Sequence, residues 1–386
     1  MPSRRVASVD IVRGAVMVLM AIDHVRVYSG LPPGGPTPGI FFTRWITHFC
    51  APAFVFLAGT SAYLYGEQLN DRRALSRFLA TRGLWLVLLE LTVIRLAWTF
   101  NLQFGTGLAG VIWVLGWSMI VLAALVRLPL AGIALFGAVI VGGHNLLSGV
   151  VAALPENGPG GPLAWLWQML YLGGPIQFGT QGPVLFVLYV LVPWVGVMAL
   201  GYAFGAILRL EAPVARRYCL AIGGGAVGLF LVLRGFNLYG DPRPWDASRM
   251  PALLSFLNTT KYPASLLFLC MTLGPVISLL PALEVAHGRV VEWLTTLGRV
   301  PLFYYLLHIP LIHLLALGYD ALRYPAAVPW MFENHPAMVG PTPDGTVWSL
   351  GELYLVFAVA VVILTFACRW YAGVKRTSSA RWLRYL

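Results

Sequence analysis

The stretch from residue 8 to residue 30 carries ionisable side chains inside an otherwise apolar run. These side chains are Asp10, Arg13, Asp23, His24 and Arg26. Insertion of a charge into hydrocarbon costs on the order of 3 kcal/mol, so such residues normally pair or face a polar cavity. A neutral histidine can accept a proton from an amine or a hydroxyl at neutral pH. The stretch therefore indicates general base chemistry at His24, with an interhelical hydrogen bond as the structural alternative.

The spacing within this stretch predicts a polar stripe if the segment is helical. Arg13 and His24 are eleven residues apart, which places them within ~20° of each other and ~16 Å apart along the helix axis. Asp10 falls on the same side and is three residues from Arg13, close enough for the two charges to neutralise each other. The predicted stripe runs from an Asp/Arg pair at one end of the helix to a histidine near the other.

Two further residues are candidates for chemistry beside His24. Asp23 points ~100° away from His24 on a helix, so it is expected to bond a neighbouring helix or Arg26 at the i+3 position. His48 begins a second apolar segment and is followed four residues later by Pro52. Because a proline frees a backbone carbonyl and kinks the helix, His48 could line the mouth of a cavity, or the kink could serve packing alone.

A later apolar segment adds a second deep histidine. Tyr304 and His308 share one face at i, i+4, and Pro310 interrupts the helix after them. With Arg299 at the start of the segment, these side chains are what a polar path through the membrane would require. A lone histidine that is satisfied within the bundle is the structural alternative for His308.

The composition places these residues in a membrane protein. Hydrophobic residues make up 59% and charged residues 11% of the 386 residues, and the mean hydropathy is +0.77. Apolar runs long enough to cross ~30 Å of hydrocarbon recur along the whole chain. We predict an all-α, polytopic membrane protein with about ten spanning helices in one bundle, forming a single domain over residues 1–386. The predicted helices cover residues 8–29, 45–68, 82–101, 107–126, 128–148, 183–208, 217–236, 262–282, 299–320 and 349–371.

The membrane class explains the net charge of +11 without nucleic acid as a partner. Most of the 26 lysine and arginine residues fall in alternate loops and at the two ends of the chain, which is the bias that marks the cytoplasmic side. We therefore predict cytoplasmic termini and four larger outer loops, at residues 30–44, 149–182, 237–261 and 321–348. The four cysteines lie in apolar segments without a CxxC spacing, which indicates small buried side chains and no metal site.

The basic segment NDRRALSRFLATRG, residues 70–83, predicts a short amphipathic helix on the cytoplasmic surface. Anchoring by the positive-inside rule accounts for its charges. The alternative is that Arg72, Arg73 and Arg77 contact the phosphates of a nucleotide-bearing thioester.

The chain resembles the bacterial branch of the heparan-alpha-glucosaminide N-acetyltransferase-like family. The resemblance is carried by RRVASVDIVRGAVMVLMAIDHVRVYSG and TRWITHFCAPAFVFLAG in the first two helices, and by LGRVPLFYYLLHIPLIH in the ninth. The broader group of transmembrane acyltransferases, which includes the sugar O-acyltransferases, shares an Arg-Gly near the start of the first helix and a histidine eleven residues on. In this chain those residues are Arg13, Gly14 and His24.

The resemblance implies an enzyme that takes an acetyl group from cytosolic acetyl-CoA and delivers it to an acceptor on the far side of the membrane. The acceptor would be an amine or a hydroxyl, often on a sugar. By the same resemblance, His24 is the general base or a transient acyl carrier, with Asp23 and His48 as further catalytic candidates. No metal is expected. The residues expected to bind the acetyl-CoA donor are Asp10, Arg13, Arg299, Tyr304 and His308.

This chain departs from the animal lysosomal members of the family at one position. Those members carry an asparagine where His24 stands, and their catalytic histidine lies further on, in the first non-cytosolic loop. This chain has no histidine between residues 25 and 47. His24 is therefore the first candidate for that role and His48 the second.

Two other function classes fit the same sequence. A secondary transporter or proton-coupled flippase would also place Asp, His and Arg within the membrane, and a structural partner of an envelope-polymer synthase needs no chemistry of its own. In every case we expect a protein of the bacterial inner membrane, in contact with lipid. The enzyme would also bind acyl-CoA and a sugar-like acceptor, and homo-oligomers are compatible with the sequence.

Overall fold

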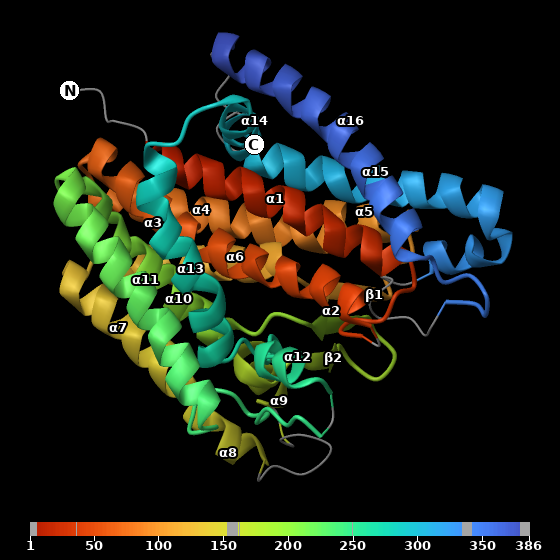
Figure 1. The fold of residues 1–386 in the computed structure, drawn as a ribbon, viewed down its shortest axis with the longest axis horizontal. Coiled ribbons are helices and arrows are strands. Elements are labelled where there is room, and N and C mark those ends of the chain that lie inside the picture. Colours follow the sequence, from red (N-terminus) through yellow and green to blue (C-terminus); the bar gives the residue numbers. More distant parts are fainter. Residues whose placement is uncertain are drawn as a thin grey trace. The chain divides into compact units, whose positions relative to one another are not determined.

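The chain folds mainly into helices (Figure 1). The computed structural model describes residues 6–35, 37–152, 161, 163–248, 250–333 and 342–378. Both ends of the chain and parts of the predicted outer loops 149–182 and 321–348 lie outside the described residues. The chain divides into two compact units, the first with Ala51–Leu91 and Gly105–Pro281, the second with Ala7–Cys50, Thr92–Phe104 and the described residues from 282 onward. The single domain over residues 1–386 stays a prediction.

The first unit holds most of the apolar helices. Its main helices are α3 (Cys50–Leu69), α4 (Arg72–Leu89), α6 (Val111–Leu125), α7 (Leu130–Gly143), α10 (Leu191–Gly205), α11 (Ala212–Gly235) and α13 (Leu266–Glu284), whose ends extend slightly past the unit's boundary in α3 and α13. Shorter elements are η3 (His144–Leu146), α8 (Leu147–Ala152), α9 (Ala164–Trp167), η4 (Gln168–Leu172), η5 (Ile207–Arg209) and α12 (Ala252–Leu257).

Small residues allow the helices of this unit to pack closely. A Cβ atom added at Gly83 of α4 would lie 2.5 Å from the backbone oxygen of Gly116 in α6, and one added at Gly116 would lie 2.6 Å from the backbone oxygen of Gly83. Such contacts are typical of membrane helices, where association depends on van der Waals packing of the backbones.

One small sheet departs from the predicted all-α fold. β1 (Thr106–Ala109), β2 (Gly174–Gln177) and β3 (Val184–Val187) form a sheet in the order β1-β3-β2. β1 pairs with β3 in parallel, and β2 pairs with β3 antiparallel. The helices predicted to start at residues 107 and 183 therefore start at Val111 and Leu191. Short apolar runs bounded by Gly and Pro fit a strand as well as a helix, which explains the error.

The second unit is built around α1 (Ala7–Tyr28). This helix packs against α14 (Arg289–Gly298), α15 (Pro301–Arg323) and α16 (Leu350–Thr377). The remaining elements are α2 (Pro38–Trp45), η1 (Ile46–Phe49), α5 (Arg95–Thr99), η6 (Pro325–Ala327) and η7 (Pro329–Phe332). A turn of π-helix, η2 (Glu90–Ile94), joins α4 to α5 along the chain.

Seven helical segments of the described chain are long and apolar enough to cross a membrane. They are Pro38–Leu69, Leu130–Val151, Leu191–Arg209, Ala212–Gly235, Leu266–Glu284, Pro301–Arg323 and Leu350–Thr377. The other three predicted segments also contain helix. However, α1 carries several charges, the predicted segment 82–101 is interrupted at η2, and α6 is a shorter apolar helix. A count of ten spanning helices stays a prediction.

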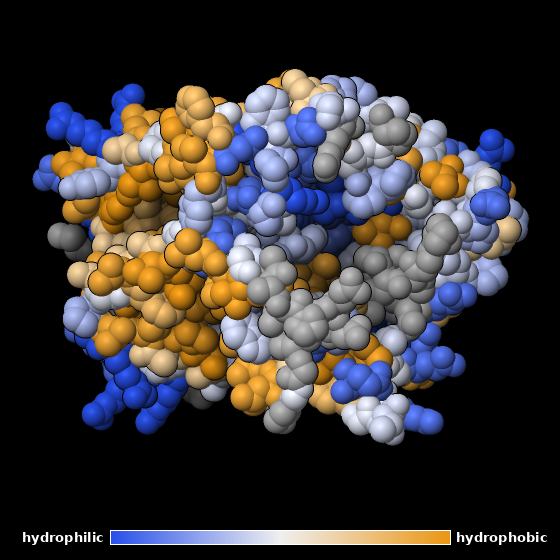
Figure 2. All heavy atoms as spheres, turned by 90° about the horizontal axis from the view of Figure 1, so that it is seen from below, coloured by the Kyte–Doolittle hydropathy of each residue, from blue (hydrophilic) through white to orange (hydrophobic). Residues whose placement is uncertain are grey.

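Apolar side chains cover outer surfaces of several helices, as hydrocarbon requires. Figure 2 shows a broad apolar area on one face, with hydrophilic residues at its edges. Exposed apolar residues lie along α16 and along α11. They are Leu355, Val359, Val362, Ile363, Phe366 and Trp370 in α16, and Leu220, Ile222, Leu229, Leu231 and Val232 in α11.

One predicted detail of the helices differs from the structure, and a second coincides with a local turn. The basic segment 70–83 is not a separate surface helix, because it forms the first turns of α4, with Asp71 as the N-cap that accepts from the backbone N–H of Arg73 and Ala74. Near Pro52 the structure has the 3₁₀ turn η1 just before α3, and the predicted kink itself stays a prediction. Pro52 cannot donate to the carbonyl of His48, which favours a tighter turn there.

Candidate functional site

The residues of the predicted stripe lie on α1, and a close contact with α14 fixes the N-terminal half of this helix. A Cβ atom added at Gly14 would lie 2.0 Å from the backbone oxygen of Leu294, and one added at Gly298 would lie 1.9 Å from the backbone oxygen of Asp10. The two backbones can approach so closely only because both positions are glycine. The Arg-Gly pair at residues 13 and 14 thus has a structural role in seating α14.

The contact with α14 brings a second arginine to the N-terminal end of the stripe. Arg13 Nη1 lies 3.8 Å from Asp10 Oδ1, and Arg299 Nε lies 3.9 Å from Asp10 Oδ2. The side chain of Asp10 is buried, whereas that of Arg299 is 52% exposed. Two guanidinium groups share one carboxylate, and this cluster is called the inner cluster. Its guanidinium groups are of the kind that bind anionic ligands.

The C-terminal half of α1 holds a pair of histidines. His24 Nδ1 lies 2.6 Å from His308 Nε2 in α15, and the two rings stack with their centroids 4.8 Å apart. The rings of His24 and of Trp98 in α5 meet edge to face, with their centroids 4.9 Å apart. His308 is fully buried, whereas His24 is partly exposed. The histidine predicted as the base is thus the accessible member of the pair.

Asp23 is paired with arginine side chains. Arg26 Nε donates to Asp23 Oδ1 at 2.9 Å, as the i, i+3 spacing predicts, and Arg44 Nε lies 3.8 Å from the same oxygen. Arg26 also donates from Nη1 to the backbone oxygen of Leu31. These contacts hold the segment after α1 in place, which is the positioning function that the structure supports for Asp23.

Tyr304 lies one turn before His308 on α15, on the same face as predicted. Its ring stacks on that of His308 with centroids 5.6 Å apart. The tyrosine is fully buried, and among the described residues its hydroxyl has no hydrogen-bond partner. A buried hydroxyl without a partner costs free energy. It therefore marks a place where a polar group of a ligand or a water molecule would be stabilised.

All of the predicted site residues thus lie in the second unit. Asp10, Arg13 and Arg299 form the inner cluster. His24, in the C-terminal half of α1, lies with His308 and Tyr304 of α15. His48 is buried in η1, and its proposed role stays a prediction. Sequence reasoning missed the direct contact between the two histidines and missed α14 itself. In RVVEWLTTLG (289–298), the apolar residues Val290, Leu294 and Leu297 recur at i, i+4 and i+7, which is the pattern that could have indicated an amphipathic helix there.

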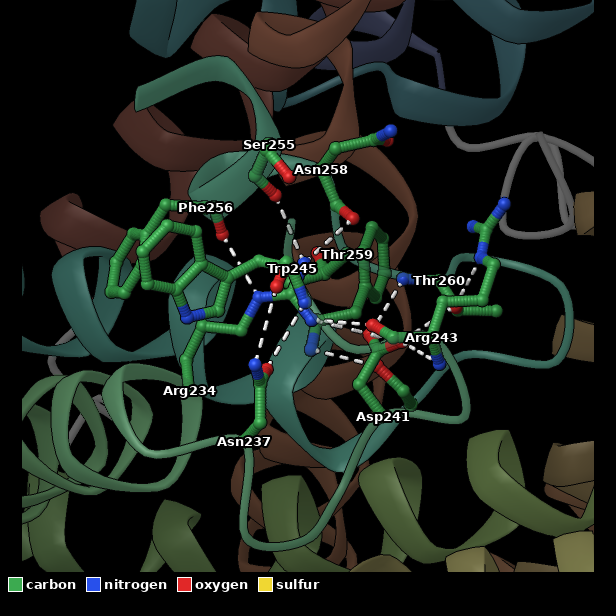
Figure 3. Close-up of polar contacts among 12 residues, drawn as sticks. Arg234, Asn237, Asp241, Arg243, Trp245, Ser255, Phe256, Asn258, Thr259 and Thr260 are labelled. Atoms are coloured by element: carbon green, nitrogen blue, oxygen red, sulfur yellow. Dashed lines mark hydrogen bonds and ion pairs between the residues drawn. The ribbon is translucent and has the colours of Figure 1, made fainter. Parts of the chain in front are cut away.

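A separate polar network occupies the loop after α11, in the first unit (Figure 3). The guanidinium of Arg234 is buried and donates to the backbone oxygens of Arg243, Ser255, Phe256 and Asn258. Asp241 accepts from the backbone N–H and hydroxyl of Thr260 and from the hydroxyl of Ser265. The side chains of Arg234 and Asp241 are satisfied within this network, so we assign it to the architecture of the loop.

The apolar helices and the polar stripe of α1 define an integral membrane protein with ionisable groups along one helix. The family described as heparan-alpha-glucosaminide N-acetyltransferase, catalytic, matches residues 5–235, more than half of the chain. The chain therefore belongs to the catalytic-domain family of these transferases. The match includes α1, and Arg299, Tyr304 and His308 lie beyond it. No curated protein matches the chain.

Proposed function

We propose that the protein is a membrane acetyltransferase that moves an acetyl group from acetyl-CoA to an amine or hydroxyl acceptor. The family supports the transferase class. The observation that carries the proposal is that an arginine-rich cluster lies at one end of α1 and an accessible histidine lies near the other. Asp10, Arg13 and Arg299 would bind the donor, and His24 would act as the general base.

The charge and exposure of the inner cluster support donor binding there. Phosphate groups favour arginine because the guanidinium offers several donors in a planar fork. Arg299 is half exposed and Arg13 is 19% exposed, so both can be reached by a ligand. Asp10 lies between them and would hold the two guanidinium groups in place in the absence of the donor.

The separation between the two ends of the stripe fits a long donor. Eleven residues of α-helix span about 16 Å, which is comparable with the reach of an extended pantetheine arm. A donor whose phosphates bind at the inner cluster could therefore present its thioester near His24. Tyr304, with its buried hydroxyl, lies close to His308 and would bind a polar group of that arm.

At His24 the proposed reaction is an ordinary acyl transfer. The acceptor's oxygen or nitrogen attacks the thioester carbonyl while His24 takes its proton. The bond from the carbonyl carbon to sulfur then breaks, and the leaving thiolate receives the proton, giving CoA and the acetylated acceptor. General base catalysis of this kind contributes about 10²–10⁴-fold to a rate. The cytosolic origin of the donor, the sugar-like acceptor on the opposite side and the bacterial inner membrane are parts of the same proposal.

The test is acetyl transfer by the purified protein in lipid nanodiscs. Radiolabelled acetyl-CoA is supplied with a panel of sugar amines and sugar alcohols, and both the acetylated product and released CoA are measured. We expect product with at least one acceptor, and a loss of at least about 100-fold in kcat for His24→Gln. His287→Gln, which changes an exposed histidine, is the matched control and should keep the wild-type rate. Full activity of His24→Gln would rule out the proposed base.

The same assay separates the enzyme from a transporter. A proton-coupled transporter could also use paired histidines, but it would leave acetyl-CoA intact. Binding of CoA, measured by titration calorimetry, distinguishes the two functions by a second criterion. If the protein is the proposed enzyme, it should bind CoA, and the Arg299→Gln variant should bind CoA more weakly. If it transports another substrate, neither the wild-type protein nor the variant should bind CoA.

A further inference from the structure

The contacts of His308 determine which of its ring nitrogens carries hydrogen. Its Nδ1 lies 2.6 Å from the backbone oxygen of Tyr305 and 3.2 Å from that of Tyr304. Carbonyl oxygens accept hydrogen bonds and cannot donate them. His308 Nδ1 must therefore carry a hydrogen and donate it to these carbonyls.

The burial of His308 determines the state of its other nitrogen. The side chain is fully buried, and the contacts that surround its ring come from neutral groups, namely His24, Tyr304 and Tyr305. A buried charge without a counter-charge is strongly disfavoured. The resting imidazole is therefore neutral, with hydrogen on Nδ1 only, and its Nε2 is an acceptor.

This acceptor fixes the tautomer of His24. His308 Nε2 lies 2.6 Å from His24 Nδ1, so His24 must donate from Nδ1. In neutral His24 the lone pair is then on Nε2. Free histidine in water prefers the opposite tautomer, with hydrogen on Nε2, so the pair holds His24 in the less common form. The chain of donors runs from His24 through His308 to the carbonyl of Tyr305.

We propose that His308 is a positioning residue that selects the Nδ1–H tautomer of His24 and thereby makes His24 Nε2 the proton acceptor of the site. The inference deepens the proposed acetyl transfer and rests on it for its catalytic meaning. When the acceptor's proton binds to His24 Nε2, the Nδ1–H of the resulting imidazolium still donates to His308. The buried ring therefore stabilises the charge that develops on the exposed one, and the proton later leaves with the CoA thiol.

The accessible surfaces of the two rings support this division of roles. His24 is partly exposed and can meet a substrate, whereas His308 is enclosed by its helix, by His24 and by Tyr304. A histidine in the orienting position holds the base in one tautomer and itself adds no negative charge. A residue that hydrogen-bonds to one ring nitrogen of a functional histidine commonly fixes its tautomer in this way.

Nitrogen NMR of the protein tests the tautomer directly. The full chain, labelled with ¹⁵N in its histidine rings, is measured in lipid nanodiscs, and His24→Gln identifies the His24 signals among those of the seven histidines. We expect His24 to show a protonated Nδ1 and an unprotonated Nε2. The opposite pattern in the wild-type protein would overturn the inference.

Two variants of His308 test the cause of that tautomer. His308→Phe keeps an aromatic ring but removes the acceptor, so His24 should shift toward the Nε2–H form. His308→Gln offers an amide oxygen to His24 Nδ1 and should retain the wild-type tautomer. An unchanged His24 spectrum in His308→Phe would contradict the proposal. His287→Gln is the spectral control, since that side chain is exposed in a loop.

Kinetics of the same variants connect the tautomer to the reaction. We expect kcat to fall about 100-fold or more in His308→Phe, with the KM for acetyl-CoA changed little, and to recover at least partly in His308→Gln. Suppose that the wild-type protein transfers acetyl groups and that the His308→Phe variant keeps the wild-type rate and the wild-type tautomer of His24. The inference about His308 then fails, whereas the proposed function stands. If the tautomer is as stated but no acetyl transfer occurs with any acceptor, the proposed function fails while the role of His308 as the tautomer-setting partner holds.

Discussion

The backbone oxygen of Leu294 occupies the space that a side chain at Gly14 would need, with only 2.0 Å to an added Cβ atom. Both groups belong to helices, so neither can move without shifting an entire element. The glycine after Arg13 therefore determines how deeply α14 seats against α1, and through Gly298 and its neighbour Arg299 it determines the geometry of the inner cluster.

Gly14→Ala should accordingly destabilise the protein and weaken donor binding together. Overpacking of this kind typically costs about 1–3 kcal/mol, and a clash with backbone lies at the upper end. We expect a lower thermal unfolding temperature in detergent and a higher KM for acetyl-CoA. Gly318→Ala, in α15 of the same unit, is the control, because an added Cβ there meets nothing within 4 Å. Equal behaviour of the two variants would contradict the assigned packing role.

Arg299→Gln should affect donor affinity more than the chemical step. The guanidinium is half exposed and 3.9 Å from Asp10, so its removal takes one positive charge from the inner cluster without leaving a cavity. We expect the KM for acetyl-CoA to rise about tenfold, which corresponds to about 1.4 kcal/mol, with a much smaller change in kcat.

The control for this variant is Arg289→Gln, which removes an exposed charge from the other end of α14. It should leave the KM near the wild-type value. The two variants change the net charge equally, so a similar rise in both would point to the general field of the surface and away from a specific contact. Increasing salt should weaken the effect at Arg299, because exposed charges are screened.

Tyr304→Phe should change stability and donor affinity in opposite directions. The hydroxyl is buried and has no partner among the described residues, so its removal relieves a desolvation cost of about 1–3 kcal/mol. The unfolding temperature should rise. If the hydroxyl binds the donor, the KM for acetyl-CoA should rise as well, by several-fold.

Tyr371→Phe provides the matched comparison. The hydroxyl of Tyr371 is likewise buried without a partner in the described part of the chain, and its ring stacks on Phe303. This variant should raise stability and leave the KM unchanged. A stabilised Tyr304→Phe with unaltered donor kinetics would remove Tyr304 from the proposed donor site.

Local helix geometry explains which parts of the site could be predicted from the sequence. The ion pairs of Asp10 with Arg13 and of Asp23 with Arg26 are both three residues apart, and the structure contains both. Their geometry follows from the pitch of a single helix, so the only requirement was to identify residues 8–29 as helical. The same reasoning placed Tyr304 on the face of His308, where the two rings stack.

Contacts between distant segments could not be predicted in the same way. His24 and His308 are separated by 284 residues, and their meeting depends on how α1 and α15 pack. Likewise, Arg299 reaches Asp10 because Gly14 and Gly298 let α14 approach α1. The sheet was missed because the apolar runs at 106–109 and 184–187 are too short for their periodicity to separate strand from helix.

The predicted cytoplasmic termini can be tested by cysteine labelling in intact cells. The four native cysteines are buried, so they should contribute little background. Ser248→Cys lies in the predicted outer loop 237–261 and should react with a membrane-impermeant thiol reagent. Arg73→Cys lies on the basic segment predicted to face the cytoplasm and should react only after permeabilisation. Both positions are exposed in the structure, so the reverse pattern would invert the predicted orientation.

Arg234→Lys should loosen the loop after α11, although the charge is conserved. Arg234 donates to four backbone oxygens in the network of Figure 3, and its side chain is 1% exposed. A lysine has three donors on a single nitrogen and cannot match the planar fork. Several buried carbonyls would lose their partner, at a cost of about 3 kcal/mol or more. Hydrogen exchange should therefore increase across residues 237–261.

Arg243→Gln is the control for Arg234→Lys. It tests whether replacing a different arginine of the same loop increases hydrogen exchange to the same extent. Arg243 supports Arg234 through its backbone oxygen, whereas its side chain donates to the hydroxyl of Thr260. Replacing that side chain therefore leaves the contacts of Arg234 intact and should cost only about 1 kcal/mol. Exchange in the loop should increase much less than in Arg234→Lys, because the backbone carbonyls keep their donor. Comparable exchange in the two variants would show that the Arg234 guanidinium is not what holds the loop.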